Sequence, residues 1–223
     1  MTDMMDREAL ERELLQQQVR QAKNGADKEE AQAVKFRLEA DALQRAKEWD
    51  EALPGYHMEY VLYGVVDGST IKNAMGDLGK WSRRAPEGTP LKVLINSPGG
   101  SVIDGLALYG FLRNLSRNGH PVTTVAIGQA SSMGGILLQA GDTRIMDAEA
   151  WLLIHEVSAG AIGNVSEMKD RTKFMERLLD QAIDILSARS TMTKRQIKNK
   201  MTRTDWWLRA DEALELGFCD EVQ

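Results

Sequence analysis

Two glycine-rich runs and one histidine contain the groups in this chain that could do chemistry. The first run, 96–101 (NSPGGS), follows an apolar stretch at 91–95, and its glycines let backbone N–H groups come close to a ligand. The second run, 128–135 (GQASSMGG), follows an apolar stretch at 122–127, and His155 ends a third apolar stretch. Each group therefore follows a segment whose pattern predicts a buried strand.

The second run places two hydroxyls, Ser131 and Ser132, immediately before Met133 and an apolar segment that predicts a helix from Ile136. A helix N-terminus directs free N–H groups and positive dipole at such an oxygen. Taken alone, Ser132 is better explained as a helix-capping hydroxyl. Together with a glycine donor loop and a histidine, it matches the groups needed for acyl transfer by a nucleophilic serine. Ser131 is interpreted as structural.

Composition excludes several other functions. The chain has 223 residues, 43% of them hydrophobic, one cysteine (Cys219) and a formal net charge of −5. A lone cysteine excludes an internal disulfide, and acidic balance argues against nucleic-acid binding, although 194–203 is locally basic and is interpreted as a solvated helix face. No apolar run approaches the roughly 20 residues of a membrane span, and no Walker motif or zinc-ligand cluster occurs. We expect a cytoplasmic protein without cofactor or metal.

The first 53 residues differ from the rest of the chain. They contain 13 acidic and 9 basic residues, with Phe36 and Trp49 as the aromatic residues. Such a segment cannot build its own core. Its pattern predicts a charged helical arm with a break at Asn24-Gly25 and an end at Pro54-Gly55. We interpret residues 1–53 as an interaction segment.

Residues 56–223 predict an α/β domain with mostly parallel crossovers, because strand and helix patterns alternate. The predicted strands are 60–66, 91–95, 122–127, 143–146 and 151–154. The predicted helices are 69–83 (interrupted by Gly76 and Gly79), 102–118, 136–140 and 166–190.

Several motifs in this domain resemble those of the proteolytic subunit of Clp protease, ClpP, within the broader ClpP/crotonase fold. The resemblance covers about residues 56–222 and includes the runs 95–101, 128–134, 154–155 and 212–218. It implies a fold of repeated β-β-α units, here preceded by a helical extension. In that family the nucleophile is the serine before Met-Gly and the base is the histidine that ends the next long strand. These are Ser132 and His155 here.

The resemblance also implies the remaining site residues. The oxyanion donors would be the backbone N–H groups of Gly99 and Met133, and a side chain at the glycine would crowd the tetrahedral intermediate. A peptide substrate would bind as an added strand beside Gly100, Ser101 and Glu156.

One departure concerns the third member of the triad. The family has an aspartate shortly after the long helix, and an ungapped alignment places that position at Met201, beside Lys200. Neither side chain can orient a histidine. Asn199 and Asp205 lie close enough to substitute, although the same alignment matches Asp205 to a family acid outside the triad. Loss of an orienting acid costs a triad enzyme about 10⁴-fold in turnover.

These features predict a serine endopeptidase that acts through an acyl-enzyme. The charged arm and 202–208 (TRTDWWL) resemble phage-encoded head maturation proteases of this family, which trim capsid or scaffold proteins inside a prohead. Two alternatives stay open: an ATPase-dependent, protein-degrading subunit, and a catalytically weak, ring-forming homologue. The pair of Ser132 and His155 argues against a crotonase-type acyl-CoA enzyme, and no lysine lies at an obvious reach for a Ser-Lys peptidase.

The resemblance also implies partners. We expect a homo-oligomer, either a heptameric ring or stacked rings, with contacts between rings through the long helix at 166–190. The arm at 1–53 is a candidate contact for an ATPase or a capsid protein. A phage-encoded protein would act in the host cytoplasm or the prohead interior, on a protein or peptide substrate and without nucleic-acid or membrane partners.

Overall fold

The computed structural model describes residues 57–157 and 162–223, together with 32–33, 35–37, 39–44, 47 and 55. The chain divides into two compact units, Met1–His57 and Met58–Gln223. The described residues from 32 to 47 are helical and exposed. The predicted break at Asn24-Gly25 lies outside the described residues, so the helical arm stays a prediction.

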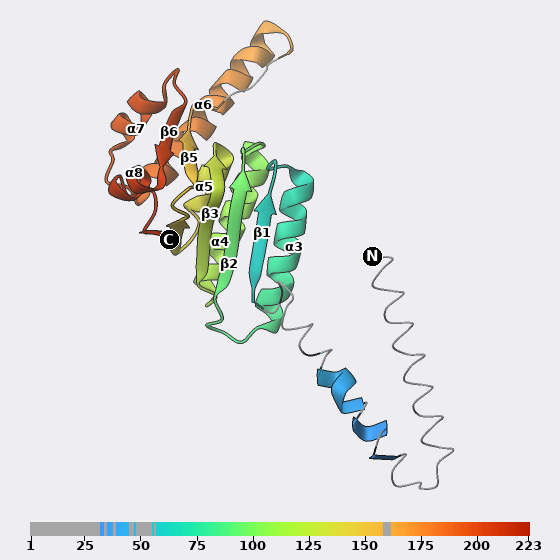
Figure 1. Ribbon diagram of the computed structural model, residues 1–223. Helices are drawn as coiled ribbons and strands as arrows, with labels where there is room; N and C mark the ends of the chain where they lie inside the picture. The colour runs from blue at the N-terminus through green and yellow to red at the C-terminus, as the bar shows by residue number, and fades with distance from the viewer. Residues whose placement is uncertain are drawn as a thin grey trace. The chain divides into compact units, whose positions relative to one another are not determined.

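A seven-stranded sheet formed by described residues organises the second unit (Figure 1). Its main order is β1-β2-β3-β4-β7, with β5 paired to β3 and β6 paired to β5. All pairs are parallel except β5–β6, which is antiparallel. The strands are β1 (Glu59–Tyr63), β2 (Leu91–Ser97), β3 (Val122–Ser131), β4 (Thr143–Met146), β5 (Trp151–Ile154), β6 (Trp206–Arg209) and β7 (Glu221–Val222).

Helices connect the parallel strands, and α4 lies behind β2 and β3 while α3 lies beside β1 (Figure 1). The long helix α6 extends beyond the sheet. The helices of this unit are α3 (Gly68–Arg84), α4 (Val102–Arg117), α5 (Met133–Leu138), α6 (Val165–Ala188), α7 (Lys194–Met201) and α8 (Ala210–Glu215). The predicted α/β architecture with a mainly parallel sheet is confirmed.

Local sequence explains most of these elements. In β2, buried and half-buried residues alternate along the strand, as expected for a strand with one face on the core. Helices α3, α6 and α7 each begin with a capping box, at Asp67, Asn164 and Thr193 respectively. These reciprocal hydrogen bonds satisfy N–H groups that the first helical turn leaves unpaired.

Three predicted details of the elements were wrong. Helix α3 is continuous through Gly76 and Gly79. An interior glycine weakens a helix by only about 1 kcal/mol, which the packing of its buried face can offset. Strand β3 continues to Ser131, four residues beyond its predicted end, and α5 begins earlier than predicted, at Met133. Strand β6 was not predicted from the sequence.

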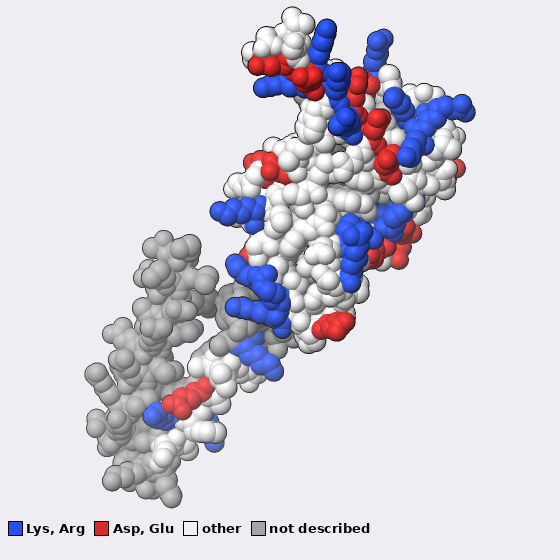
Figure 2. Space-filling view, turned by 180° about the vertical axis from the view of Figure 1, so that it is seen from behind, with Lys and Arg blue, Asp and Glu red and all other residues white. Residues whose placement is uncertain are grey.

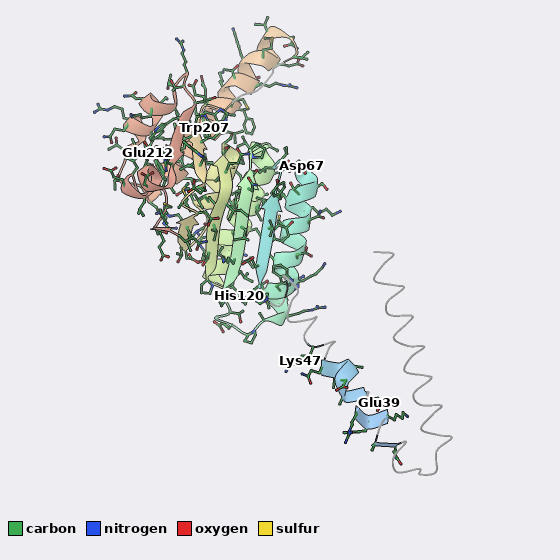
Figure 3. All side chains as sticks on the ribbon, viewed as in Figure 1. Glu39, Lys47, Asp67, His120, Trp207 and Glu212 are labelled. Carbon is green, nitrogen blue, oxygen red and sulfur yellow. The ribbon has the colours of Figure 1, made fainter. Side chains whose placement is uncertain are left out.

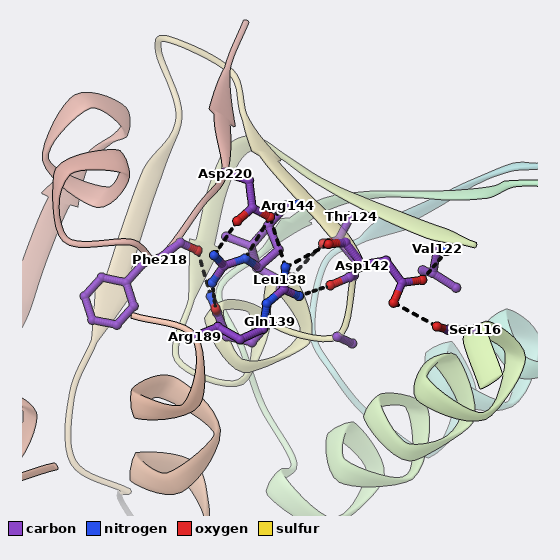
Figure 4. A network of polar contacts seen from close by, with 12 residues as sticks. Ser116, Val122, Thr124, Leu138, Gln139, Asp142, Arg144, Arg189, Phe218 and Asp220 are labelled. Atoms are coloured by element: carbon purple, nitrogen blue, oxygen red, sulfur yellow. Dashed lines mark hydrogen bonds and ion pairs between the residues drawn. The ribbon is translucent and has the colours of Figure 1, made fainter. Parts of the chain in front are cut away.

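A network of polar contacts joins β4, β7 and the end of α6 (Figure 4). Arg144 is 2% exposed and donates to both carboxylate oxygens of Asp220 and to Gln139. Arg189, which follows α6, also donates to Asp220 and to the backbone of Gly141 and Asp142. These bonds hold the C-terminal end of α6 against the sheet.

The basic run 194–203 forms α7 and the turn after it. Ile197 and Met201 are buried, whereas the lysines and arginines of the run are exposed. Lys194 pairs with Asp184 of α6 at 2.6 Å. Figure 2 shows acidic side chains among the basic ones toward the end of the molecule that α6 and α7 form. The solvated helix face that the sequence predicts is therefore present.

Candidate active site

The site lies where β2, β3 and β5 end. Parallel pairing aligns Ser97 of β2 with Ala130 of β3, and Ser131 of β3 with Leu153 of β5. Because parallel strands end on the same edge of a sheet, the residues that follow these three strands are brought together. They are the glycine loop at 98–100, Ser132 and His155.

Ser132 occupies a strained turn between β3 and α5. Its φ is 54° and its ψ is −118°, and residues with a Cβ rarely adopt a positive φ. The backbone fixes this geometry, because its N–H donates to Leu153 at 2.8 Å and its carbonyl accepts from Gly135 and Ile136. The hydroxyl makes no capping hydrogen bond. The structure therefore does not support the alternative that Ser132 is a helix cap, and strain of this kind is typical of functional sites.

Gly99 and Gly100 form the opposite wall. Both have positive φ, 93° and 148°, and a Cβ on Gly99 would lie 2.6 Å from Cβ of Ser132. Two backbone hydrogen bonds to Val66 hold the loop. The carbonyl of Gly99 accepts from the N–H of Val66, and the N–H of Ser101 donates to the carbonyl of Val66. Only glycine can therefore occupy this approach to the serine.

The two glycine amides differ in their hydrogen bonds. The Gly99 N–H, the predicted oxyanion donor, already donates to the buried hydroxyl of Ser97 at 3.1 Å. The Gly100 N–H has no acceptor among the described residues, and Gly100 lines the cavity beside Ser132. The amide of Met133 begins α5, where the preceding turn offers it no carbonyl. Gly100 and Met133 thus have the free N–H groups next to the serine.

His155 lies next to one carboxylate, that of Asp205. The antiparallel pairing of β5 with β6 sets Ile154 opposite Trp206, so His155 and Asp205 are the next residues beyond this pair. The distance from Nδ1 of His155 to Oδ1 of Asp205 is 3.8 Å, close enough for charge attraction and longer than a hydrogen bond. The side chains are 26% and 67% exposed respectively.

The structure shows where the candidates for the third triad position lie. Met201, where the alignment placed it, is 2% exposed and belongs to the apolar core. Lys200 lies over the ring of Trp206, and Asn199 is exposed on α7. Asp205, one of the two alternatives, is the acid beside the histidine. The sequence did not predict strand β6, whose antiparallel pairing with β5 brings Asp205 beside His155.

Ser132 and His155 line one cavity of about 270 Å³. Gly100 and Met133 belong to the same wall, and the described residues that line the cavity include no Lys, Arg, Asp or Glu. Most of the remaining wall is aliphatic or thioether, from Val102, Ile136, Ile154, Leu179, Leu186 and Met201. A hydroxyl and an imidazole therefore line the same mainly apolar space.

Ser101 and Glu156, two of the predicted substrate-binding residues, make hydrogen bonds within the protein. Ser101 caps α4 by accepting from the N–H of Asp104, and its own N–H donates to Val66. Glu156 accepts a hydrogen bond from the backbone N–H of Arg203 at 3.1 Å. Of the three predicted positions, only Gly100 lines the cavity.

Another histidine, His120, lies apart from this cavity, and the possible metal ligands among the described residues form no cluster. His120 lies at the opposite end of the sheet from Trp207 (Figure 3), with Nδ1 3.2 Å from the carbonyl of Thr89. No group of three or more His, Cys, Asp or Glu side chains among the described residues could hold a metal ion. None of the helices formed by the described residues has the length and apolarity to cross a bilayer.

A mainly parallel α/β sheet that brings a strained serine and a histidine to one apolar cavity, with a carboxylate beside the histidine, is typical of a serine-type peptidase. Comparison with known proteins agrees. The Clp protease family model matches residues 62–223, and the chain belongs to this family.

Several curated relatives are named as subunits of the ATP-dependent Clp protease. The chain is 34% identical over 134 residues to the proteolytic subunit of Deinococcus radiodurans, a match that covers 59% of this chain and 64% of that protein. It is 35% identical over 164 residues to proteolytic subunit 3 of Rhodococcus jostii, covering 73% and 79% respectively. It is 36% identical over 131 residues to proteolytic subunit 2 of Tropheryma whipplei, covering 58% and 71%.

Proposed function

We propose that this chain is a serine endopeptidase in which Ser132 is the nucleophile and His155 is the general base. The observation that carries the proposal is the shared cavity: a serine in a strained turn and a histidine line the same apolar space, beside two amides free to donate. Membership of the Clp protease family supports the same reaction.

The reaction follows from these positions. The imidazole of His155 removes the hydroxyl proton of Ser132 as its oxygen attacks the peptide carbonyl carbon. Gly100 and Met133 donate their N–H groups to the oxyanion. His155 then passes the proton to the leaving amine, which breaks the peptide bond and leaves an acyl-enzyme. Water, deprotonated by the same histidine, releases the acid product and restores the serine.

Asp205 completes this arrangement as the group that orients the imidazole. A carboxylate next to Nδ1 keeps the proton on that nitrogen, so that the other nitrogen faces the serine, and it stabilises the imidazolium that forms. Its distance of 3.8 Å is longer than a hydrogen bond. Hydrogen bonds of catalytic residues commonly shorten when substrate binds. We expect the same of this pair.

The cavity also supports a substrate preference. Its wall is mainly aliphatic, and no charged side chain among its lining residues could pair with a charged substrate group. A large apolar side chain on the acyl side of the cleaved bond would fill the space and exclude water. Backbone pairing of the substrate as an added strand beside Gly100 would make cleavage otherwise tolerant of sequence.

The narrower biological role is a further part of the proposal. Processing of phage capsid or scaffold proteins rests on the charged segment 1–53 and on the run at 202–208. The relatives' names instead suggest a subunit of an ATP-dependent protease. An ATPase partner and a ring-shaped homo-oligomer, which the resemblance implies, would fit that role. Mass spectrometry of capsid and scaffold termini, with and without active protein, separates these roles: new termini at apolar residues support the first.

The central experiment compares Ser132→Ala with Ser131→Ala. Ser131 is a matched control because it is adjacent and buried, and its hydroxyl donates to Gln129 at 3.0 Å. We expect wild type and Ser131→Ala to cleave an apolar peptide substrate and to bind a fluorophosphonate at Ser132, and Ser132→Ala to do neither. Loss of the nucleophile in a serine protease costs about 10⁶-fold in turnover. Undiminished cleavage by Ser132→Ala would reject the assignment, and absence of labelling in assembled wild type would favour the non-catalytic alternative.

A further inference from the structure

We propose that Glu156 is a positioning residue whose carboxylate holds the turn at 202–205, so that Asp205 faces the imidazole of His155. This inference rests on the proposed peptidase function. It assigns Glu156 a contact with the enzyme's own backbone in place of the contact with substrate that the sequence predicts.

The topology brings His155 and Glu156 close to the turn that contains Arg203 and Asp205. His155 and Glu156 leave the end of β5, while the turn at 202–205 enters the start of β6. Because the two strands are antiparallel, the exit of one lies beside the entrance of the other. The turn that carries Asp205 therefore lies next to the segment that carries the histidine.

The turn depends on an unfavourable backbone conformation. Arg203 has a φ of 54°, in the left-handed region that residues with a Cβ avoid. Its N–H donates to Oε2 of Glu156 at 3.1 Å. The next residue, Thr204, donates its N–H to the carbonyl of Met201 at the longer distance of 3.4 Å. A hydrogen bond to a carboxylate is stronger than one to a neutral acceptor. The hydrogen bond to Glu156 therefore stabilises the strained conformation of Arg203.

The position of Asp205 is set by this turn more than by its own side chain. The side chain is 67% exposed, and the ion-pair contact with His155 is its only polar contact within the described residues. Attraction between exposed charges is weak, so it cannot by itself hold the carboxylate in place. A small displacement of the turn would move Asp205 away from Nδ1, and misplacement by about 1 Å can cost a catalytic group about 100-fold in rate.

The first test compares Glu156→Ala with Glu156→Gln. Alanine removes the acceptor, whereas the amide oxygen of glutamine can still accept from the Arg203 N–H. We expect Glu156→Ala to lower kcat by up to about 100-fold with KM little changed, and Glu156→Gln to restore most of the loss. A rise in KM with kcat unchanged would show that Glu156 contacts substrate, and would overturn the proposal.

The second test asks whether Glu156 acts through Asp205. In an Asp205→Ala background the substitution Glu156→Ala should have no further effect on kcat, because the group that it positions is gone. A full additional loss in that background would overturn the proposal. Circular dichroism and thermal unfolding of each variant separate such effects from loss of the fold.

The third test uses the strain at Arg203. Glycine adopts positive φ without a Cβ penalty, so Arg203→Gly should keep the turn formed even without the glutamate bond. We expect the double variant Glu156→Ala, Arg203→Gly to recover at least part of the kcat lost in Glu156→Ala. No recovery, together with equal kcat in Glu156→Ala and Glu156→Gln, would overturn the proposal.

Fluorophosphonate labelling of wild type keeps the two proposals apart. If wild type is not labelled at Ser132, the peptidase function itself fails. If wild type is labelled and turns over, but Glu156→Ala has the wild-type labelling rate and kcat, only the role of Glu156 fails. Slower labelling of Glu156→Ala, restored in Glu156→Gln, is the result that the proposal expects.

Discussion

The site and the Arg144 network use their polar groups in opposite ways. Arg144 directs Nε, both terminal nitrogens and its backbone N–H at acceptors, and Asp142 accepts from Arg113, Ser116 and the N–H of Val122. At the site, by contrast, the Ser132 hydroxyl and the Gly100 amide have no hydrogen-bond partner among the described residues. Polar groups whose hydrogen bonds are all made within the protein stabilise the fold. Polar groups left without a partner beside a strained turn are available to a substrate.

The difference has a physical cause in the layers of the fold. The network lies between β4, β7 and the ends of α4 and α6, where burial makes an unpaired charge costly and each donor is therefore matched. The site lies at the open ends of three strands, where solvent or substrate can satisfy groups that the protein leaves free. We expect substitutions at the site to change turnover, and substitutions in the network to change stability.

The largest expected effect tests the acid of the site. Asp205→Asn should lower kcat by about 10⁴-fold, because an amide donates to the imidazole and favours the wrong tautomer. Steady-state kinetics on an apolar peptide measures it, with Asp211→Asn as the control, an exposed aspartate of α8 that pairs with Arg209 at 3.7 Å. A loss below about tenfold would show that the reaction does not depend on this carboxylate, and would weaken the contrast between the two regions.

A second prediction concerns the glycine loop. In Gly100→Ala the new Cβ would lie 2.2 Å from the carbonyl oxygen of Val66, at a φ of 148°, so the loop and its Gly100 amide must shift. We expect a loss of about 10²- to 10³-fold in kcat, the cost of one oxyanion donor. Gly110→Ala is the matched control, because a Cβ there meets nothing within 4 Å and lies in the helix α4. Wild-type turnover in Gly100→Ala would exclude its amide from the oxyanion site.

The third prediction turns to the network. Arg144→Met keeps much of the side-chain volume but leaves Asp220 without its main partner, and should lower the free energy of unfolding by about 3 kcal/mol. Fluorophosphonate labelling per folded molecule should stay near that of wild type. Denaturant unfolding measures the loss, with the exposed Arg117→Met as the control. If labelling per folded molecule also falls well below that of wild type, the network affects the site, and the two regions do not have the separate roles argued above.

Sequence predicted the strands that carry Ser132 and His155, because apolar runs followed by glycine or histidine are local signals. Strands β4 and β5 have the predicted bounds. Three features were not readable in this way. The Gly99 amide is occupied by the Ser97 hydroxyl whereas that of Gly100 is not, the contact of Asp205 with His155 depends on the pairing of β6 with β5, and the network joins residues up to 79 positions apart. Each is a tertiary contact between segments whose local patterns are unremarkable.

The smallest expected effect is the pH dependence of the network. Burial alone would raise the pKa of Asp220, but hydrogen bonds from the side chain and backbone of Arg144, and the charges of Arg144 and Arg189, outweigh it and lower that pKa below its usual value. A lowered pKa in the folded state means that the carboxylate stabilises the fold above the usual aspartate pKa, about 3.9, and that this contribution is lost as pH falls through the lower folded value.

Asp220→Asn tests this sign. At neutral pH it should lower the free energy of unfolding by about 1 kcal/mol, which lowers Tm by about 2–4 °C in a domain of this size. The difference in Tm between wild type and variant should shrink as pH falls below about 4, because protonation gives wild-type Asp220 the same neutral state as asparagine. Thermal unfolding between neutral and acidic pH measures it, with Asp211→Asn as the control. A difference in Tm that grows in acid would mean that the hydrogen bonds from Arg144 do not lower the pKa of Asp220. The network would then hold this carboxylate less well than its hydrogen bonds indicate.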